Sequence, residues 1–356
     1  MQRILSLEAN NLISRYLYNY RFLLSYILIG LLSIIIEIGI YRSAKGLVSE
    51  DLSLILAVST SILFAFILNI KFNFKVPKPK RNKSFFYFSL ISVMAFVINY
   101  QFYQLISQST PYEISRLISS GSLFLLGYVL HRRFSFKEYK KVGVAVYADG
   151  NENIKEIYEK IQYVGDFIHI DIVDKSFNKD SPDPATYRLE TVRAYWPNKE
   201  IHCHIMSKTP LIWIEQVKDY VDTIIIHFDI AENLESVISM IKNSGKKVGI
   251  CLAVADDLML VDPYLPSIDE VMLLTIPRPG RSGQKFHFDS LKKIKKLNDH
   301  PLRSNFILSV DGGINDSIIH LVQAEKVISG SYVLCADNPQ RNIMRLQTSS
   351  QYEALS

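Results

Sequence analysis

The chain contains 356 residues, 48% of them hydrophobic, and its formal net charge is +5 at neutral pH. At roughly 150 residues per domain, this length predicts about two domains. Residues 1–141 carry 17 Lys and Arg against 6 Asp and Glu, whereas residues 142–356 carry 23 against 29. Because the positive charge belongs to the more apolar half, it does not indicate a nucleic-acid partner. Three cysteines at no metal or disulfide spacing exclude a disulfide-built domain and suit a reducing compartment: Cys203, Cys251 and Cys335.

The first half is expected to form an α-helical four-span membrane domain over residues 1–141. A bilayer core of about 30 Å takes roughly 20 apolar residues of helix. Four buried helices of a soluble bundle are the alternative, but such helices would show a polar face, and residues 22–40 show almost none. The first apolar run is also too long for a cleaved signal peptide and lacks a small-residue cleavage site. The uncharged stretches predict spans near residues 20–41, 52–72, 86–108 and 113–132.

The basic residues predict the orientation of these spans. They precede the first span, lie between the second and third, and follow the fourth, whereas the other two loops hold few. By the positive-inside rule, both termini then lie on the cytoplasmic side of the cell's plasma (inner) membrane. The second half of the chain is therefore expected in the cytosol.

The membrane domain contains an internal repeat with a period of 62 residues. Residues 68–75 recur as residues 130–137 with four identities, and the same offset places Glu37 opposite Asn99. Each unit has two predicted spans, so both units enter the membrane from the same side and the repeat is parallel. The sequence therefore predicts two helical hairpins related by a pseudo-twofold axis along the membrane normal.

The four spans, the stretch 30–37 that ends in Glu37, and the Asn-x-Lys-Phe-x-Phe end of the second span resemble the GtrA-like family of small four-span proteins. The resemblance covers about residues 18–138. It implies that the domain handles or translocates a polyprenyl-phosphate-linked sugar during cell-surface polysaccharide synthesis. A four-span unit is small for a transport path, so we expect a homo-oligomer, at least a dimer.

Polar residues of the membrane domain are candidates for a binding site. Glu37 is costly in lipid and is expected to face a polar cavity or a partner, unless it reaches the nearby interface. The basic residues that end spans two and four, with Lys75 and Lys137 among them, either bind a lipid phosphate or only fix the topology. The predicted polar site consists of Glu37, Asn69, Asn99, Lys71, Arg132 and Arg133.

Residues 142–345 alternate short apolar runs with amphipathic segments, and residues 346–356 form a tail. Eight strand–helix units in about 205 residues predict an α/β domain, a compact (β/α)8 TIM barrel. A doubly wound open sheet is the alternative, but it would need a glycine-rich turn after the first strand, where residues 147–150 offer one glycine. The candidate strands are 142–148, 166–172, 200–206, 222–228, 247–253, 270–275, 305–310 and 325–330, with helices such as 151–163, 232–243 and 289–298 between them.

Polar side chains gather at the carboxyl ends of these strands, where a barrel builds its active site. His169 and Asp171 share one face of the second strand, because side chains alternate along a strand. The third strand ends with His202-Cys203-His204, and the seventh runs into Asp311. Two imidazoles and two carboxylates suit one divalent metal ion such as Zn²⁺, Fe²⁺ or Mn²⁺.

Glycine-bearing turns follow the last three predicted strands. In a barrel, the turns after strands seven and eight commonly bind phosphate through backbone amides. A phosphate site beside a metal indicates a phosphorylated sugar or a similar polyol as substrate. The candidate phosphate-binding residues are Gly280, Ser282, Gly283, Gly312, Gly313, Gly330 and Ser331.

These segments together resemble the ribulose-phosphate 3-epimerase family. The matching stretches occur in order through residues 142–335, among them 169–174, 204–206, 226–229, 249–252, 279–286 and 310–314. The resemblance implies that His169, Asp171, His204 and Asp311 bind the metal. It also implies that Asp171 and Asp311 exchange the substrate proton through an enediolate. Met206 and His227 are then candidates for the substrate pocket.

The sequence departs from the family pattern around the expected pocket. No serine ends the first strand, Val173 stands in place of a methionine, Lys175 stands in place of a glycine, and the loop before Gly280 gains a residue. The metal-binding set is complete, so we expect a membrane-anchored bifunctional protein with an active cytosolic epimerase. The alternative is a transport or scaffold protein whose barrel only binds a sugar phosphate.

Overall fold

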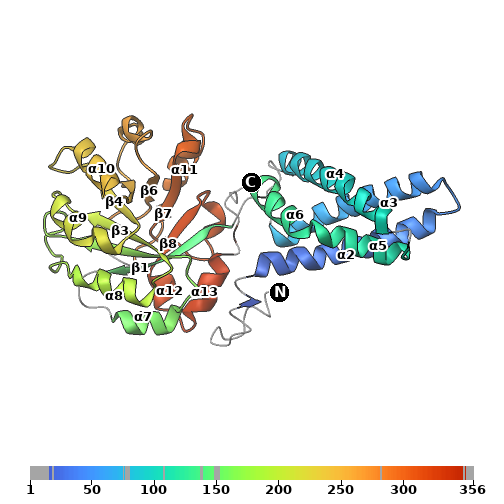
Figure 1. The fold of residues 1–356 in the computed structure, drawn as a ribbon. Helices are drawn as coiled ribbons and strands as arrows, with labels where there is room; N and C mark the ends of the chain where they lie inside the picture. The colour runs from blue at the N-terminus through green and yellow to red at the C-terminus, as the bar shows by residue number, and fades with distance from the viewer. Residues whose placement is uncertain are drawn as a thin grey trace. The chain divides into compact units, whose positions relative to one another are not determined.

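The computed structural model describes residues 16–17, 20–74, 76, 81–106, 109–136, 139–147, 153–280, 283–347 and 349. The chain divides into two compact units, with the boundary between Glu138 and Tyr139. One unit is made of helices and the other is an α/β barrel (Figure 1).

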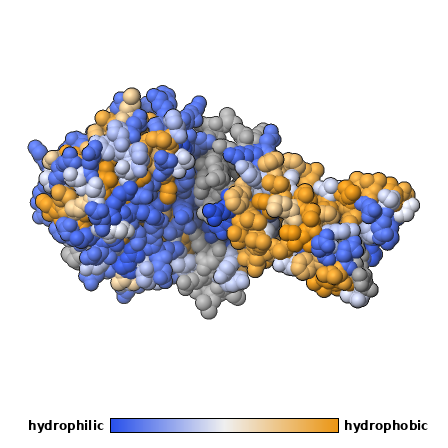
Figure 2. Space-filling model, turned by 45° about the horizontal axis from the view of Figure 1, so that its top comes forward, coloured by the Kyte–Doolittle hydropathy of each residue, from blue (hydrophilic) through white to orange (hydrophobic). Residues whose placement is uncertain are grey.

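The helical unit contains three helices that are long and apolar enough to cross a membrane, counted among the described residues. Figure 2 shows apolar residues over most of the visible surface of this unit, whereas hydrophilic residues prevail on the barrel. Side chains such as Ile35 and Leu125, both 65% exposed, would face water in a soluble bundle. An apolar outer surface over satisfied helical backbone is what a membrane-spanning domain requires. The three helices are α2 (Arg21–Ala44), α3 (Glu50–Leu68) with its extension to Asn73, and α4 (Arg81–Ile106).

The fourth predicted span is not one straight helix. Helices α5 (Tyr112–Ser122) and α6 (Phe124–Leu130) meet at Leu123 with a bend of 51°. The bend follows the run Ser-Ser-Gly-Ser at residues 119–122, where the Ser122 hydroxyl donates to the Ser119 carbonyl over 2.6 Å. Kinks of this kind commonly lie at Gly and Ser, whose side chains support the helix weakly or compete for its carbonyls.

The 62-residue repeat is visible in the backbone. Two π-helical turns lie at equivalent positions, η1 (Asn69–Asn73) after α3 and η3 (His131–Ser135) after α6. The first and last side chains of each turn are joined in the same way. Asn73 donates to Asn69 over 3.1 Å, and His131 Nδ1 lies 3.1 Å from the Ser135 hydroxyl. Such turns are rare and are often found at functional sites.

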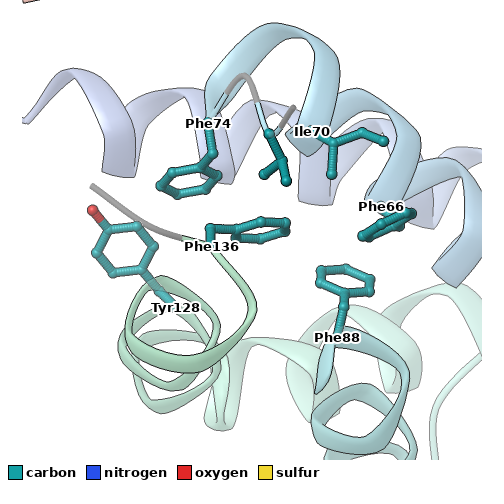
Figure 3. Close-up of a cluster of buried hydrophobic side chains, with 7 residues drawn as sticks. Phe66, Ile70, Phe74, Phe88, Tyr128 and Phe136 are labelled. Atoms are coloured by element: carbon teal, nitrogen blue, oxygen red, sulfur yellow. The ribbon is translucent and has the colours of Figure 1, made fainter. Parts of the chain in front are cut away.

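One aromatic contact between the two copies occurs twice at equivalent positions, as a twofold axis requires. Tyr26 contacts Tyr128 with ring centroids 5.3 Å apart, and the equivalent residues Phe88 and Phe66 are 5.4 Å apart. The equivalent rings of Phe74 and Phe136 stack on each other at 4.5 Å and 10° (Figure 3). The two helical hairpins are therefore related by a pseudo-twofold axis that passes near this stacked pair.

The second unit is a closed barrel of parallel strands in sequence order, with β1 paired to both β2 and β8. Its strands are β1 (Lys141–Tyr147), β2 (Phe167–Val173), β3 (Glu200–Met206), β4 (Thr223–His227), β5 (Lys247–Leu252), β6 (Glu270–Leu274), β7 (Ile307–Asp311) and β8 (Lys326–Ser329). Its α-helices are α7 (Ile154–Ile161), α8 (Tyr187–Tyr195), α9 (Leu211–Val217), α10 (Leu234–Asn243), α11 (Ser290–Asn298), α12 (Ser331–Leu334) and α13 (Pro339–Leu346).

Two barrel connections differ from the predicted strand–helix repeat. Between β5 and β6 the described chain forms short 3-10 turns, η5 (Leu258–Leu260) and η6 (Asp262–Tyr264), and between β7 and β8 it forms η8 (Ile319–Leu321). Pro263 lacks a backbone N–H, so η5 cannot continue through it into η6 as one regular helix. Within the first predicted helix, 151–163, the structure describes α7, which begins after the capping side chain of Asn153 and ends before Gln162, whose φ is +45°.

The described part of the predicted tail packs against the barrel. The Gln347 amide donates to the Val164 carbonyl and to Asp166 over 3.0 and 2.8 Å, and the buried Lys140 ammonium donates to the Ser349 hydroxyl over 3.3 Å. These bonds tie the last described residues to the start of the barrel. The sequence pattern missed this because single polar residues carry no periodic signal.

A buried ion network fills the amino-terminal end of the barrel interior. Lys326 and Glu270 are each 2% exposed and pair over 2.9 Å. The same ammonium group lies 3.3 Å from Glu200 and 3.0 Å from His202 Nε2. Buried charges are tolerated only when they are paired in this way.

This network predicts acid sensitivity. Burial alone would raise the pKa of Glu270, but the charges of His202 and Lys326 lower it. A carboxyl whose folded pKa is lowered contributes stability above its unfolded pKa of about 4.3, and that contribution is lost as the pH falls further. Glu270→Gln should destabilise the protein by about 3–5 kcal/mol at neutral pH and flatten the acid limb of its Tm–pH profile. Thermal unfolding between about pH 3 and 8 tests this, with the exposed Glu215→Gln variant as control. A Tm–pH profile of Glu270→Gln that runs parallel to that of the wild-type protein would contradict the prediction.

Candidate functional site

Strand register brings the four predicted metal ligands together. His169 and Asp171 lie on β2, and Asp171 is directly opposite His204 on β3. Asp311 is the last residue of β7, where the Thr275 amide and hydroxyl donate to its carbonyl over 2.7 and 2.8 Å. One donor atom from each of the four residues lies within 4.8 Å of the others.

Asp171 is at the centre of this group. Its Oδ1 lies 3.0 Å from His204 Nδ1 and 3.3 Å from His169 Nε2. The other nitrogen of His204, Nε2, lies 3.0 Å from His227 Nε2. His227 therefore holds the ring of His204 so that Nδ1 is directed toward the shared site, as partners of metal-binding histidines commonly do.

The two carboxyl groups have opposite electrostatic environments. Burial alone would raise the pKa of Asp171, but His169 and His204 lower it well below its usual range. Burial and the negative charge of Asp171 raise the pKa of Asp311 to about 7. Without a metal ion, the carboxyl of Asp171 is therefore ionised near neutral pH, and that of Asp311 takes up a proton more readily. Such a division is typical of an acid–base pair.

The four residues fit a divalent metal ion. Both ring nitrogens of His169 are buried and make no hydrogen bond among the described residues. Among these residues, Nε2 has only the 3.3 Å contact with Asp171, and a metal ion at the common centre would bind one of the two nitrogens and so reduce the cost of burying the ring. Two nitrogen and two carboxylate ligands match the donor preferences of Zn²⁺, Fe²⁺ and Mn²⁺.

The predicted pocket residues lie beside this centre. Met206 is two residues beyond His204 on β3 and is buried, and His227 packs against Phe177 with ring centroids 4.8 Å apart. Lys175, a departure from the family pattern, pairs over 2.7 Å with Asp183, so part of its charge is compensated.

Sequence reasoning missed several residues of the site. Asp174 accepts hydrogen bonds from the Ser207 hydroxyl and from Trp213 Nε1 over 2.5 and 2.8 Å, which fixes the loop after β2. Cys251, opposite His227 in register, contributes to a second group of potential ligand atoms with His204 and His227. The period of two along β5 would have indicated that Cys251 faces inward, whereas no local pattern relates Ser207 and Trp213 to Asp174.

A cavity of about 490 Å³ lies beside the loops that follow β6, β7 and β8. Three of the predicted phosphate-binding residues line it, namely Gly313, Gly330 and Ser331. Lys285 and Asn315 also line it, although neither was predicted. The predicted residues Gly280, Gly283 and Gly312 do not line this cavity, and Ser282 lies outside the described residues.

Gly313 needs to be glycine for two reasons. Its φ is +68°, which side-chain-bearing residues rarely adopt, and a Cβ would lie 2.4 Å from the backbone nitrogen of Phe286. The loops after β6 and β7 therefore touch through backbone at this point. This close approach leaves backbone amides, rather than side chains, to line part of the cavity.

The membrane domain has a cavity of its own, of about 200 Å³. Three of the predicted polar residues line it: Glu37, Asn69 and Asn99. Glu37 is 5% exposed and accepts a hydrogen bond from the Ser61 hydroxyl over 3.3 Å. The predicted cationic residues do not line this cavity. Lys71 lies over the ring of Phe72, Arg132 over Phe22, and Arg133 over Phe134.

The sequence of the barrel matches the model of the ribulose-phosphate 3-epimerase family over residues 143–334, more than half of the chain. The chain belongs to the ribulose-phosphate 3-epimerase family. It is 28% identical over 194 residues to ribulose-phosphate 3-epimerase of Chlamydia trachomatis, covering 51% of this chain and 81% of that protein. The corresponding protein of Schizosaccharomyces pombe is 26% identical over 202 residues, covering 55% and 86%. That of Buchnera aphidicola is 32% identical over 171 residues, covering 46% and 74%. The second unit is thus an epimerase-type isomerase domain.

Residues 25–136 match the GtrA/DPMS transmembrane domain model. The helical unit with its three apolar helices and one bent helix pair is therefore a GtrA-like membrane domain. The chain is a fusion of a membrane domain and a ribulose-phosphate 3-epimerase-type barrel, as the two sequence resemblances predicted.

Proposed function

We propose that the barrel is a metal-dependent sugar-phosphate 3-epimerase and that His169, Asp171, His204 and Asp311 form its catalytic centre. The observation that carries this proposal is the convergence of these four side chains at the carboxyl ends of β2, β3 and β7. A cavity whose lining includes Gly313, two residues after Asp311, is the candidate site for the phosphate. Family membership supplies the reaction class, and the site supplies the residues.

The proposed mechanism uses the two carboxyl groups in turn. One carboxylate removes the proton from the carbon next to the ketone, and the electron pair that remains forms an enediolate. The other carboxyl, in its acid form, returns a proton to the opposite face of that carbon, which inverts it. Asp171 and Asp311 are the two carboxyl groups of the site that are close enough together to take these two roles. A bound divalent ion would act as a Lewis acid for the negative charge on the substrate oxygens.

The phosphate group of the substrate is proposed to lie in the 490 Å³ cavity. Backbone amides near Gly313, Gly330 and Ser331 and the Lys285 ammonium are the donors there. Gly280, Ser282, Gly283 and Gly312 would shape the loops around them. Met206 and His227 would contact the sugar carbons near the metal centre.

Exchange of the substrate proton with solvent tests this function. Full-length protein in detergent, loaded with Zn²⁺, Fe²⁺ or Mn²⁺, is expected to exchange the C3 proton of a ketose phosphate and to release its epimer. Ribulose 5-phosphate is the first substrate to try, with other ketose phosphates beside it. If the protein binds the sugar phosphates but exchanges the C3 proton of none of them, the barrel only binds its ligand, as in a transport or scaffold protein.

A second function is proposed for the membrane domain, which would handle or translocate a polyprenyl-phosphate-linked sugar for cell-surface polysaccharide synthesis. The specific observation is that Lys71, Arg132 and Arg133 lie on the two π-helical turns of the repeat. A lipid phosphate is an anion that such residues attract, at about 1 kcal/mol for each cation near the surface. We further propose that both termini and the barrel are cytoplasmic, and that the protein forms at least a dimer.

Arg132→Gln combined with Arg133→Gln tests the lipid-phosphate site. The double variant is expected to weaken binding of a polyprenyl phosphate in detergent by about tenfold or more, because two cations near the anion are removed. Protease accessibility of the barrel in sealed vesicles gives the topology in the same samples. The exposed pair Lys292→Gln and Lys296→Gln in the barrel is the control. Unchanged binding with unchanged topology would refute the site.

A further inference from the structure

The cavity of the membrane domain lies on the pseudo-twofold axis. Twenty residues line it, and eighteen of them form nine pairs that are 62 residues apart in sequence. Examples are Tyr26 with Phe88, Glu37 with Asn99, and Asn69 with His131. A cavity left by chance imperfections of packing would draw residues from the two copies without regard to their equivalence. The pairing shows that both copies contribute the same positions to one central space.

Contacts outside the cavity support the same axis. The Asn73 amide donates to the Phe22 carbonyl over 3.2 Å, and at the equivalent positions the Ser84 hydroxyl donates to the Ser135 carbonyl over 2.5 Å. Each hairpin is thus closed by a hydrogen bond between the same two positions, although the donor is the later residue in the first copy and the earlier residue in the second. The stacked Phe74 and Phe136 then join the hairpins, as Figure 3 shows.

The two halves of the lining have different chemistry. Glu37 on one side corresponds to Asn99 on the other, and Ser61 corresponds to Leu123. The Ser61 hydroxyl donates to the Glu37 carboxylate. The carboxylate therefore lies on one side only, opposite an amide, whereas both sides contribute hydroxyls, Ser61 on the first and Ser92 and Ser120 on the second. A buried carboxylate is expensive within a membrane and is retained there mostly for function.

We propose that this cavity binds the uncharged, hydroxyl-rich head group of an amphiphile. Carboxylate, amide and hydroxyl groups bond well to vicinal hydroxyls, and the aromatic side chains Phe88, Phe96 and Phe124 in the lining can contact the C–H groups between them. Among the described residues, no Lys or Arg lines the cavity, and the Glu37 carboxylate disfavours a phosphate there. A volume of about 200 Å³ is small beside the pockets of drug-sized ligands and suits a head group alone.

This inference deepens the proposed lipid-linked function, on which it rests for the identity of the amphiphile. The site is single because it lies on the axis, and the Glu37–Asn99 difference gives the bound head group one orientation. Lys71 and Arg132 follow closely after the lining residues Asn69 and His131 in sequence. A phosphate that precedes the head group would lie toward these cations, outside the cavity.

Cysteine labelling of the full-length protein in liposomes tests the site. Ser92 lines the cavity, and the membrane domain has no cysteine of its own. Cys335 is exposed and is replaced by serine, whereas Cys203 and Cys251 are buried. The rate at which methyl methanethiosulfonate labels Ser92→Cys is then measured. The ligand probe is n-octyl β-D-glucopyranoside, added below its micellar concentration.

The glucoside is expected to slow labelling of Ser92→Cys at least fivefold, whereas n-octanol at the same concentration slows it less than twofold. Ser59→Cys, an exposed position outside the cavity, should show no difference between the two probes. Equal effects of glucoside and octanol on Ser92→Cys would overturn the proposal. Because the probe has no phosphate, this result is independent of the lipid-phosphate test of Arg132 and Arg133.

Swapping the side chains at the equivalent positions 37 and 99 tests whether the two sides of the cavity are related by the pseudo-twofold axis. Glu37→Asn should abolish protection by the glucoside, and the double variant with Glu37→Asn and Asn99→Glu should restore it, because the carboxylate returns at the equivalent position. Glu37→Gln, which keeps the shape of the side chain, is measured beside them in case Glu37→Asn folds poorly. Protection that persists without the carboxylate, or that fails to return in a monodisperse double variant, would contradict the inference.

Discussion

Asp311→Asn is expected to abolish exchange of the substrate proton with solvent and to lower kcat/KM at least about 1,000-fold. General acid–base catalysis typically contributes 10²–10⁴-fold, and Asp311 is proposed both to move a proton and to bind the metal. Its carbonyl is fixed by Thr275, so the fold around it should be kept. The measurement is solvent exchange at C3 of the ketose phosphate, followed in the full-length protein in detergent.

Two comparisons separate the roles of Asp311. Asp171→Asn should also stop exchange, whereas Asp229→Asn, at an exposed strand end where Asp229 pairs with Lys208, should leave it unchanged. Metal content measured in the same samples shows whether Asp311→Asn acts through the proton or through the metal. Retained exchange in Asp311→Asn would remove Asp311 from the mechanism.

His169→Ala is expected to remove the metal and with it at least about 100-fold of the activity. The His169 side chain is fully buried and its Nε2 lies 3.3 Å from the Asp171 carboxylate, so the folding of His169→Ala is checked before its metal content is measured. Metal analysis should change from about one ion per chain to none. The loss of activity should match that of the wild-type protein after treatment with a chelator.

A second measurement, independent of catalysis, is the stabilisation that metal gives to the folded state. At a free metal concentration 100 times Kd, binding stabilises the native state by about 2.7 kcal/mol. Added metal should therefore raise the Tm of the wild-type barrel and of the exposed control variant His320→Ala, but not that of His169→Ala. An equal rise in all three proteins would mean that the metal binds elsewhere.

Several features followed from local sequence patterns because their physical causes are local. The long uncharged runs predicted membrane helices because the bilayer sets a minimum apolar length. The alternation along β2 placed His169 and Asp171 on one face because side chains of a strand alternate. The 62-residue offset related Glu37 to Asn99, and the structure places both in one cavity.

Other features needed the tertiary structure, because they depend on contacts between distant residues. The bend at Leu123 divides a span that apolarity alone predicted as one helix. The roles of Thr275, Ser207 and Trp213 come from single hydrogen bonds to residues far away in the chain. No periodic pattern encodes such bonds.

The sequence by itself determined the division of the chain into an apolar, basic membrane half and an acidic barrel half, and it determined which strand ends carry imidazoles and carboxylates. Only the tertiary structure decided that closing the barrel brings Asp311 of β7 to within a few ångströms of β2 and β3. Only the tertiary structure decided that the two copies of the repeat face each other across a polar cavity. The reason is physical. Hydrophobic periodicity indicates which face of each helix or strand is buried, whereas a site is formed by the packing of segments that are far apart in the sequence.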